Sequence, residues 1–146
     1  MEFYTYRLPN GIRGIHRQVK GAVAHCALVV DAGSRDERTG EYGLAHFTEH
    51  AFFKGTQRRR AWQVNCRLEN LGGELNAFTT KEDTTIHATT LRRDFPQAAE
   101  LIADVAFRPV YPDRALEREK EVIADALNPH KASPPALLYD TFQAMP

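Results

Sequence analysis

Two histidines, His46 and His50, lie four residues apart, and Glu49 immediately precedes the second. This order, H-x-x-E-H, predicts a helix, because residues four apart return to nearly the same helical face. Both imidazoles can then hold one metal ion from consecutive turns, with the carboxylate on the same side. The pattern favours zinc-assisted hydrolysis, in which a third ligand completes the cage and the carboxylate deprotonates a bound water. A plain amphipathic helix with packed or exposed histidines is the alternative that the pentad by itself leaves open.

Length and charge narrow the range of functions. The chain has 146 residues, enough for one domain with a buried core. Lys plus Arg and Asp plus Glu both number 19, so the charge balance gives no argument for a nucleic-acid or anionic-membrane partner. The N-terminus has no apolar core of signal-peptide length, and no stretch approaches a membrane span. We therefore expect a soluble, cytoplasmic protein, although a removed signal would leave no trace in this sequence.

Three other features have structural interpretations. Cys26 and Cys66 form no C-x-x-C pair, and two buried thiols are favoured over a disulfide. The basic run at 58–60 is interpreted as a solvated face or a helix start rather than as a phosphate site. His25 falls within an apolar run, which favours a packed or hydrogen-bonded core histidine over a metal ligand.

Hydrophobic periodicity predicts strands, then helices, then a hairpin, then helices. The expected elements are a hairpin of strands over 3–8 and 12–19, a central strand over 22–32, helices over 44–53 and 61–71, strands over 74–80 and 84–91, a helix from Asp94 through Val105, a helix from Asp113 to about 131, and a short closing helix over 136–144. This order favours an α+β fold, a two-layer sandwich with helices packed on an antiparallel or mixed sheet.

Five stretches occur in a fixed order along the chain, and one of them contains the pentad. They are LPNGI at 8–12, DAGSRDE at 31–37, GLAHFTEHAFFKGT at 43–56, GGELNAFTT at 72–80 and EREKEVI at 117–123. Together they resemble the pitrilysin-like zinc metallopeptidases, and bacterial members most of all. The similarity spans nearly the whole chain. It implies that residues 1–146 are a single N-terminal zinc-binding domain, a fragment of a longer peptidase.

The resemblance also implies roles for individual residues. His46 and His50 would bind zinc, and Glu49 would be the general base. The strand that follows Gly73 would be an exposed edge that pairs with an extended peptide substrate, with Asn76 and Ala77 against the peptide backbone. The Asn76 amide can also donate to a developing oxyanion, or it can simply satisfy strand backbone.

The sequence departs from the family pattern at the third zinc ligand. That ligand is a glutamate seven residues after the position of Glu119, and here the position is Ala126, whose methyl group cannot bind a metal. Asp125 is a poor substitute, because it is rotated by about 100° on the helix. Glu119 lies about 10 Å along the helix axis from position 126. It is expected either to orient a ligand near the site or to be an ordinary charge paired with Arg118 or Lys120.

These observations support three hypotheses. The first is a zinc-dependent endopeptidase domain, impaired by the loss of the third ligand, which needs a second peptidase-type domain or subunit to complete its cleft. The second is a non-catalytic, peptide-binding or partner subunit of the same family. The third is a plain structural domain with a fortuitous pentad.

Overall fold

The structure is a computed structural model that describes the backbone of residues 2–131 and the side chains of residues 2–123. The elements in chain order are β1 (Tyr4–Arg7), β2 (Arg13–His16), β3 (Val23–Val30), the 3-10 helix η1 (Ser34–Asp36), α1 (Leu44–Ala51), the 3-10 helix η2 (Phe52–Lys54), α2 (Ala61–Glu69), β4 (Glu74–Thr79), β5 (Thr84–Leu91), the 3-10 helix η3 (Arg92–Asp94), α3 (Phe95–Phe107) and α4 (Asp113–Lys131). The closing helix expected over 136–144 lies outside the described residues.

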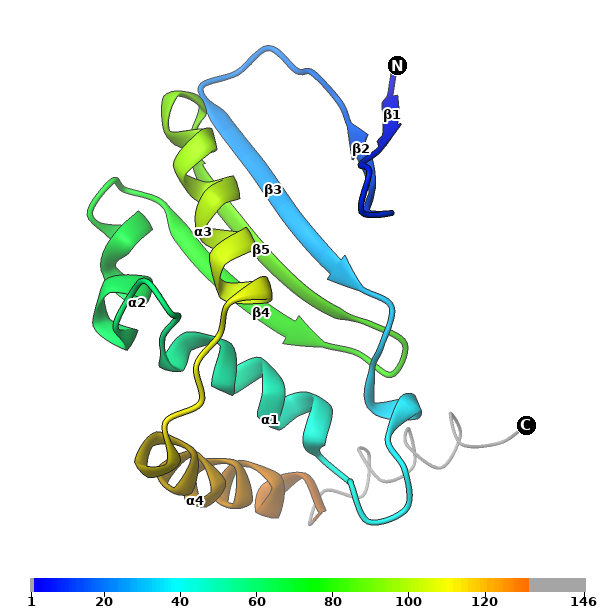
Figure 1. Cartoon of the computed structure of the whole chain (residues 1–146), viewed down its shortest axis with the longest axis vertical. Helices are drawn as coiled ribbons and strands as arrows, with labels where there is room; N and C mark the ends of the chain where they lie inside the picture. The colour runs from blue at the N-terminus through cyan, green and yellow to red at the C-terminus, as the bar shows by residue number, and fades with distance from the viewer. Residues whose placement is uncertain (1, 132–146) are drawn as a thin grey trace.

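Three antiparallel strands form the main sheet in the order β3-β5-β4, and β1 pairs with β2 as a separate hairpin (Figure 1). The expectation of a central strand over 22–32 is wrong within the part of the chain that the structure describes, because β5 lies in the middle. The apolar run of β3 is the basis for the predicted central position. One face does pack on the core through Cys26 and Leu28, but Val23 and Val29 on the other face are 47% and 63% exposed.

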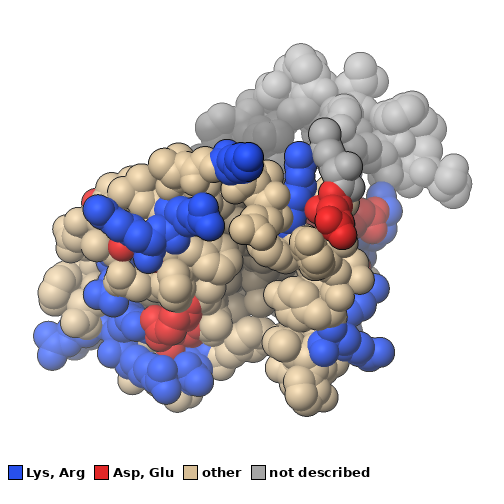
Figure 2. Space-filling view, turned by 90° about the horizontal axis from the view of Figure 1, so that it is seen from above, with Lys and Arg blue, Asp and Glu red and all other residues tan. Residues whose placement is uncertain are grey.

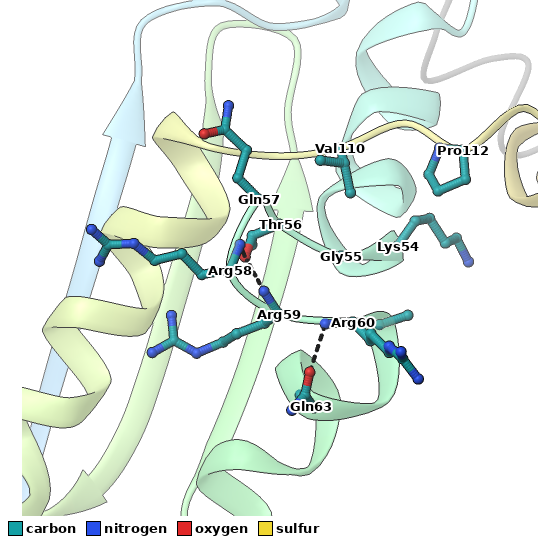
Figure 3. A pocket seen from close by; sticks show the side chains of 11 residues that line it. Lys54, Gly55, Thr56, Gln57, Arg58, Arg59, Arg60, Gln63, Val110 and Pro112 are labelled. Atoms are coloured by element: carbon teal, nitrogen blue, oxygen red, sulfur yellow. Dashed lines mark hydrogen bonds between the residues drawn. The ribbon is translucent and has the colours of Figure 1, made fainter.

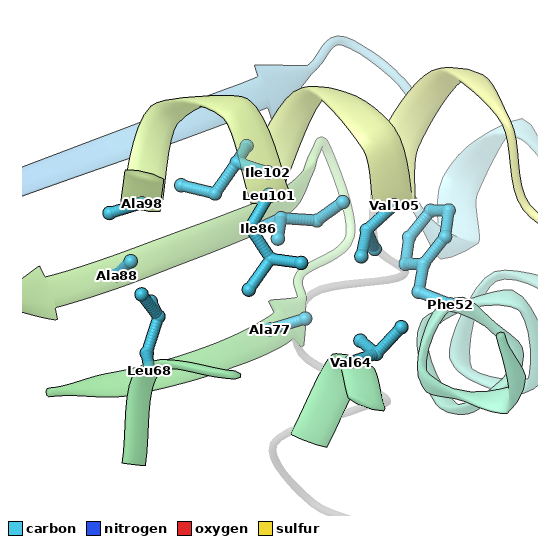
Figure 4. Packing of buried hydrophobic residues seen from close by; sticks show 10 residues of the cluster. All are labelled: Phe52, Val64, Leu68, Ala77, Ile86, Ala88, Ala98, Leu101, Ile102 and Val105. Carbon is cyan, nitrogen blue, oxygen red and sulfur yellow. The ribbon is translucent and has the colours of Figure 1, made fainter. Parts of the chain in front are cut away.

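The helices α1, α2 and α3 cover one face of this sheet, which confirms the two-layer α+β arrangement (Figure 1). Helix α3 lies over β3 and β5, whereas α1 and α2 pack against β4. Between the layers lies a core of ten buried apolar residues, Phe52, Val64, Leu68, Ala77, Ile86, Ala88, Ala98, Leu101, Ile102 and Val105 (Figure 4). The spacing of these residues in α2 and α3 is that of one helical stripe.

A glycine pair turns the chain from α2 into β4. Gly72 has φ +73°, the left-handed conformation that glycine adopts without strain, and Gly73 donates its N–H to the carbonyl of Leu68 at 2.9 Å. A Cβ atom at Gly73 would lie 2.7 Å from the Thr89 carbonyl oxygen, so only glycine fits beside β5. The turn fixes where β4 begins, and thus where this edge of the sheet runs beside α1.

Three side chains that the sequence predicts to be buried, those of Cys26, Cys66 and His25, are less buried than expected. Cys26 and Cys66 are free and half-buried. His25 is exposed rather than in the core, although its Nδ1 is hydrogen-bonded to the Thr89 hydroxyl at 3.0 Å.

Asp94 occupies the N-cap position of α3 without a side-chain cap bond. No helix in the described range 2–131 is long and apolar enough to cross a membrane.

Candidate metal centre

A carboxylate in the loop that precedes α1 fixes the helix that carries the pentad. The two carboxylate oxygens of Glu37 accept hydrogen bonds from the backbone N–H groups of Gly43, at 2.9 Å, and Ala45, at 2.8 Å. These N–H groups have no partner within the helix, and a carboxylate at a helix N-terminus also interacts favourably with the helix dipole. Glu37 therefore caps α1 and ties it to the loop that follows β3.

The helix brings the three residues of the pentad together, as the sequence predicts. One potential ligand atom from each of His46, Glu49 and His50 lies within 4.8 Å of the others. The Nε2 atoms of the two histidines are 3.1 Å apart. The carboxylate of Glu49 makes no hydrogen bond or ion pair with any described residue. These three side chains could hold a metal ion. The unpaired carboxylate of Glu49 is also available for proton transfer.

The long helix α4 contributes a buried acid to this centre. Glu119 is 7% exposed, and its Oε1 lies 2.6 Å from Nδ1 of His50, while Oε2 forms an ion pair with Lys54. Burial raises the pKa of Glu119, but the hydrogen bonds from Lys54 and His50 outweigh that effect and leave the pKa below its usual value. The partners of the Glu119 carboxylate are thus His50 and Lys54, from the segment that carries the pentad, and not a neighbour on its own helix. Lys120 pairs instead with Glu117.

Hydrogen-bond directions follow from this contact. A carboxylate only accepts, so His50 donates Nδ1–H to Glu119, and its Nε2 is then free of a proton in the neutral ring. The Nε2–H of His46 can donate to it in the metal-free protein. Position 126 belongs to the same helix, but its side chain lies outside the described residues.

The predicted substrate residues lie on β4, which is an edge strand of the described sheet. The side-chain oxygen of Asn76 accepts a hydrogen bond from the backbone N–H of Ala77 at 2.9 Å. A cavity of about 360 Å³ opens beside this edge and is lined by Phe53, Asn65, Glu69, Leu75 and Asn76. The Asn76 side chain thus borders a hollow between η2, α2 and the strand.

A second cavity, of about 450 Å³, lies where the chain leaves η2 and enters α2 (Figure 3). The basic run at 58–60 lines it, yet the side chains of Arg58 and Arg59 extend towards α3 and that of Arg60 points the other way (Figure 3). Arg59 binds the buried Asp104 of α3 at 2.5 Å, and Arg60 donates its backbone N–H to Gln63 at 2.8 Å. The run therefore has a structural role at the start of α2.

On the face of the molecule shown in Figure 2, Lys and Arg side chains lie around acidic ones rather than in one continuous basic patch. This distribution matches the net charge of zero for the whole chain.

Sequence reasoning gave no role to three of the residues that build the centre and its surroundings. Glu37 and Lys54 fall inside stretches that resemble the family. The partners of Glu37 are backbone N–H groups six and eight residues away, whereas Glu119, the partner of Lys54, is distant in sequence. Asp104 is a charged residue on the apolar stripe of α3, and this was the available signal for a buried ion pair. It accepts hydrogen bonds from Thr56 and Arg59, and so fastens the segment after η2 to α3.

Comparisons with known proteins agree on one family. The family described as Insulinase (Peptidase family M16) matches residues 15–145. The mitochondrial-processing peptidase subunit beta of Saccharomyces cerevisiae is 39% identical over 120 residues, which are 82% of this chain and 26% of that protein. Its counterpart from Mus musculus is 34% identical over 137 residues, 94% of this chain and 28% of that protein.

A solved structure gives the same result for the fold. A protease from Helicobacter pylori superposes with a TM-score of 0.89 at 26% sequence identity, over 94% of this chain and 34% of that one. The chain therefore spans between about a quarter and a third of the length of these relatives.

Proposed function

Since the chain belongs to peptidase family M16, the insulinase family, we propose that it is a single zinc-binding domain of a metalloendopeptidase. The observation that carries this proposal is the convergence of His46, Glu49 and His50, with ligand atoms within 4.8 Å of one another. A fortuitous pentad on a structural helix would also bring these side chains together, but it would not need the buried carboxylate of Glu119 that fixes one of the rings.

The donor set suits zinc. Two nitrogens on one tetrahedral zinc, at zinc–nitrogen distances of about 2.0–2.1 Å, are separated by about 3.3 Å. The Nε2 atoms of His46 and His50 are already 3.1 Å apart. Glu119 orients His50 through its other ring nitrogen, as the outer partners of zinc-bound histidines do. When bound, zinc would polarise the scissile carbonyl and make a bound water more acidic.

Glu49 is the residue proposed as general base. It lies on the same helical face as the histidines, and its carboxylate is unpaired among the described residues. A carboxylate that is not neutralised by a cation can accept a proton from the attacking water and later return it to the leaving amine. His46 and His50 would hold the metal while Glu49 moves the proton.

The free edge of β4 is proposed as the peptide-binding element. An extended peptide can add to an edge strand through backbone hydrogen bonds, and side chains on one face of the peptide then enter neighbouring pockets. Asn76 and Ala77 lie on this edge, next to the cavity of about 360 Å³. A substrate carbonyl would take the Ala77 N–H and displace the Asn76 oxygen, which frees the Asn76 amide for the oxyanion.

We propose that hydrolysis is impaired in this chain, because Ala126 occupies the position of the third ligand. Zinc held by two imidazoles and water should bind far more weakly than in a three-ligand centre. The same substitution favours the second candidate function, a non-catalytic subunit that binds peptide or a partner. In either case a second peptidase-type domain or subunit would close over the β4 edge.

Zinc competition with a chromogenic chelator tests the metal centre. We expect unmutated protein to bind one zinc weakly and the variants His46→Ala and His50→Ala to bind none. His87→Ala is the matched control, because His87 lies on β5 outside the group. Equal zinc binding by all four proteins would overturn the assignment. Peptide hydrolysis as fast as that of active family enzymes would overturn the proposed impairment.

A further inference from the structure

Lys54 and His50 share one carboxylate. Lys54 ends η2, immediately after α1, and its amino group pairs with Oε2 of Glu119, while His50 bonds Oε1 of the same group. The side chain of Glu119 is 9% exposed, and those of Lys54 and His50 are 27% and 29% exposed. In Figure 3 the Lys54 side chain extends away from Arg58 and Arg59. The contact therefore joins α4 to the helix that carries the pentad.

The buried carboxylate of Glu119 is stable in its ionised form only if a positive charge lies nearby. A buried carboxylate that loses a partner is strongly destabilising, because water no longer solvates it. A neutral His50 supplies one hydrogen bond but no positive charge, and Lys54 supplies the cation. Lys54 is thus the group whose positive charge stabilises the ionised Glu119 beside His50.

The same contact seats the long helix. Among the side chains of α4 that the structure describes, only Glu119 and Ile123 are buried, and α4 packs against α1. Ile123 supplies a non-directional apolar contact, which fixes neither the rotation nor the sliding of a helix as a hydrogen-bonded ion pair does. The placement of α4 against the helix that carries the histidines therefore depends on the Glu119 contact.

We propose that Lys54 is a positioning residue of the metal centre. It holds Glu119 in place, Glu119 fixes the ring of His50, and the pair holds α4 against α1. This role for Lys54 rests on the proposed function, because it serves a metal centre. The effects of Lys54 on Glu119, His50 and α4 can nevertheless be measured in the metal-free chain.

The test compares Lys54→Met, Lys54→Arg and Lys120→Met in the metal-free full chain. Lys54→Met keeps the apolar stem and removes the charge, whereas Lys54→Arg keeps the charge. Lys120→Met removes a lysine of α4 that pairs only with Glu117 among the described residues. Amide hydrogen exchange of residues 114–123 reports the seating of α4, and nitrogen NMR of the His50 ring at fixed pH reports which ring nitrogen carries the proton.

In Lys54→Met we expect the hydrogen-exchange rates of the α4 amides to rise at least about tenfold. The neutral form of His50 that carries its proton on Nδ1 should no longer be the main one. Lys54→Arg and Lys120→Met should resemble the unmutated chain, and the core amides of α3 should stay protected in all. Unchanged α4 exchange and an unchanged His50 ring in Lys54→Met would overturn the proposal. Loss of α3 protection as well would also overturn it, because the effect would then be general instability. Failure of the unmutated chain to bind any zinc would count against the proposed function alone, since neither readout needs metal.

Discussion

The side-chain oxygen of Asn76 accepts a hydrogen bond from the backbone N–H of Ala77 at 2.9 Å. Thr80 donates its N–H to the carbonyl of Asp83 at 2.8 Å, so the alternation of an antiparallel ladder directs the N–H of Ala77 away from β5, to the free edge. Asn76 therefore covers an edge donor that would otherwise invite strand pairing with other chains. A peptide that adds to this edge must displace Asn76.

Removal of this cover should be visible at a single amide. In Asn76→Ala we expect the amide hydrogen of Ala77 to exchange about two- to tenfold faster, as the loss of one hydrogen bond implies. Asn65→Ala is the control, because Asn65 lines the same cavity from α2. Saturating amounts of an extended peptide should slow the Ala77 amide in the unmutated chain and in both variants. A bound peptide that leaves this amide unprotected would contradict the proposed edge.

The cap on α1 should contribute measurably to stability. Glu37→Ala removes the acceptor for the N–H groups of Gly43 and Ala45, and loss of such a cap costs about 0.5–2 kcal/mol of unfolding free energy. Urea unfolding measures this difference. Glu117→Gln, which breaks an exposed pair with Lys120, should cost less than about 0.5 kcal/mol. Equal stability of Glu37→Ala and Glu117→Gln would show that the cap is not needed.

The buried Asp104 predicts a defined response to acid. Burial raises its pKa, but the bonds from Thr56, Arg59 and Arg108 lower it more, so its pKa in the folded chain is below the ordinary value. A depressed pKa gives stability that is complete above the unfolded pKa, about 3.9, and is lost as the pH falls through the folded pKa. Asp104→Asn should therefore flatten the fall in unfolding free energy below about pH 4.

At neutral pH the same variant should be less stable by about 3 kcal/mol, because Arg59 loses its buried partner. Unfolding in urea at several pH values measures both effects, with Glu117→Gln as the control. An acid response of Asp104→Asn as steep as that of the unmutated chain would contradict the role given to Asp104.

Local patterns predicted the parts of the molecule that depend on neighbours in sequence. The spacing of His46 and His50 is enough to place both on one face of α1, and the turn between β4 and β5 follows from its polar residues. The edge position of β3 was missed, because an apolar run does not reveal whether a strand has one neighbour or two. The contact of His50 with Glu119 joins residues 69 apart, and no periodicity encodes such a contact.

The most direct test of an incomplete metal centre is the zinc dissociation constant of Ala126→Glu, measured by chelator competition beside the unmutated chain. Ala124→Glu is the matched control, because it adds the same side chain about 200° around the helix. We predict that only Ala126→Glu gains affinity, by at least about 100-fold for one zinc ion, because a third protein ligand completes the centre. Equal affinities of Ala126→Glu and the unmutated chain, or tight binding of one zinc by the unmutated chain, would contradict a centre that lacks its ligand at position 126.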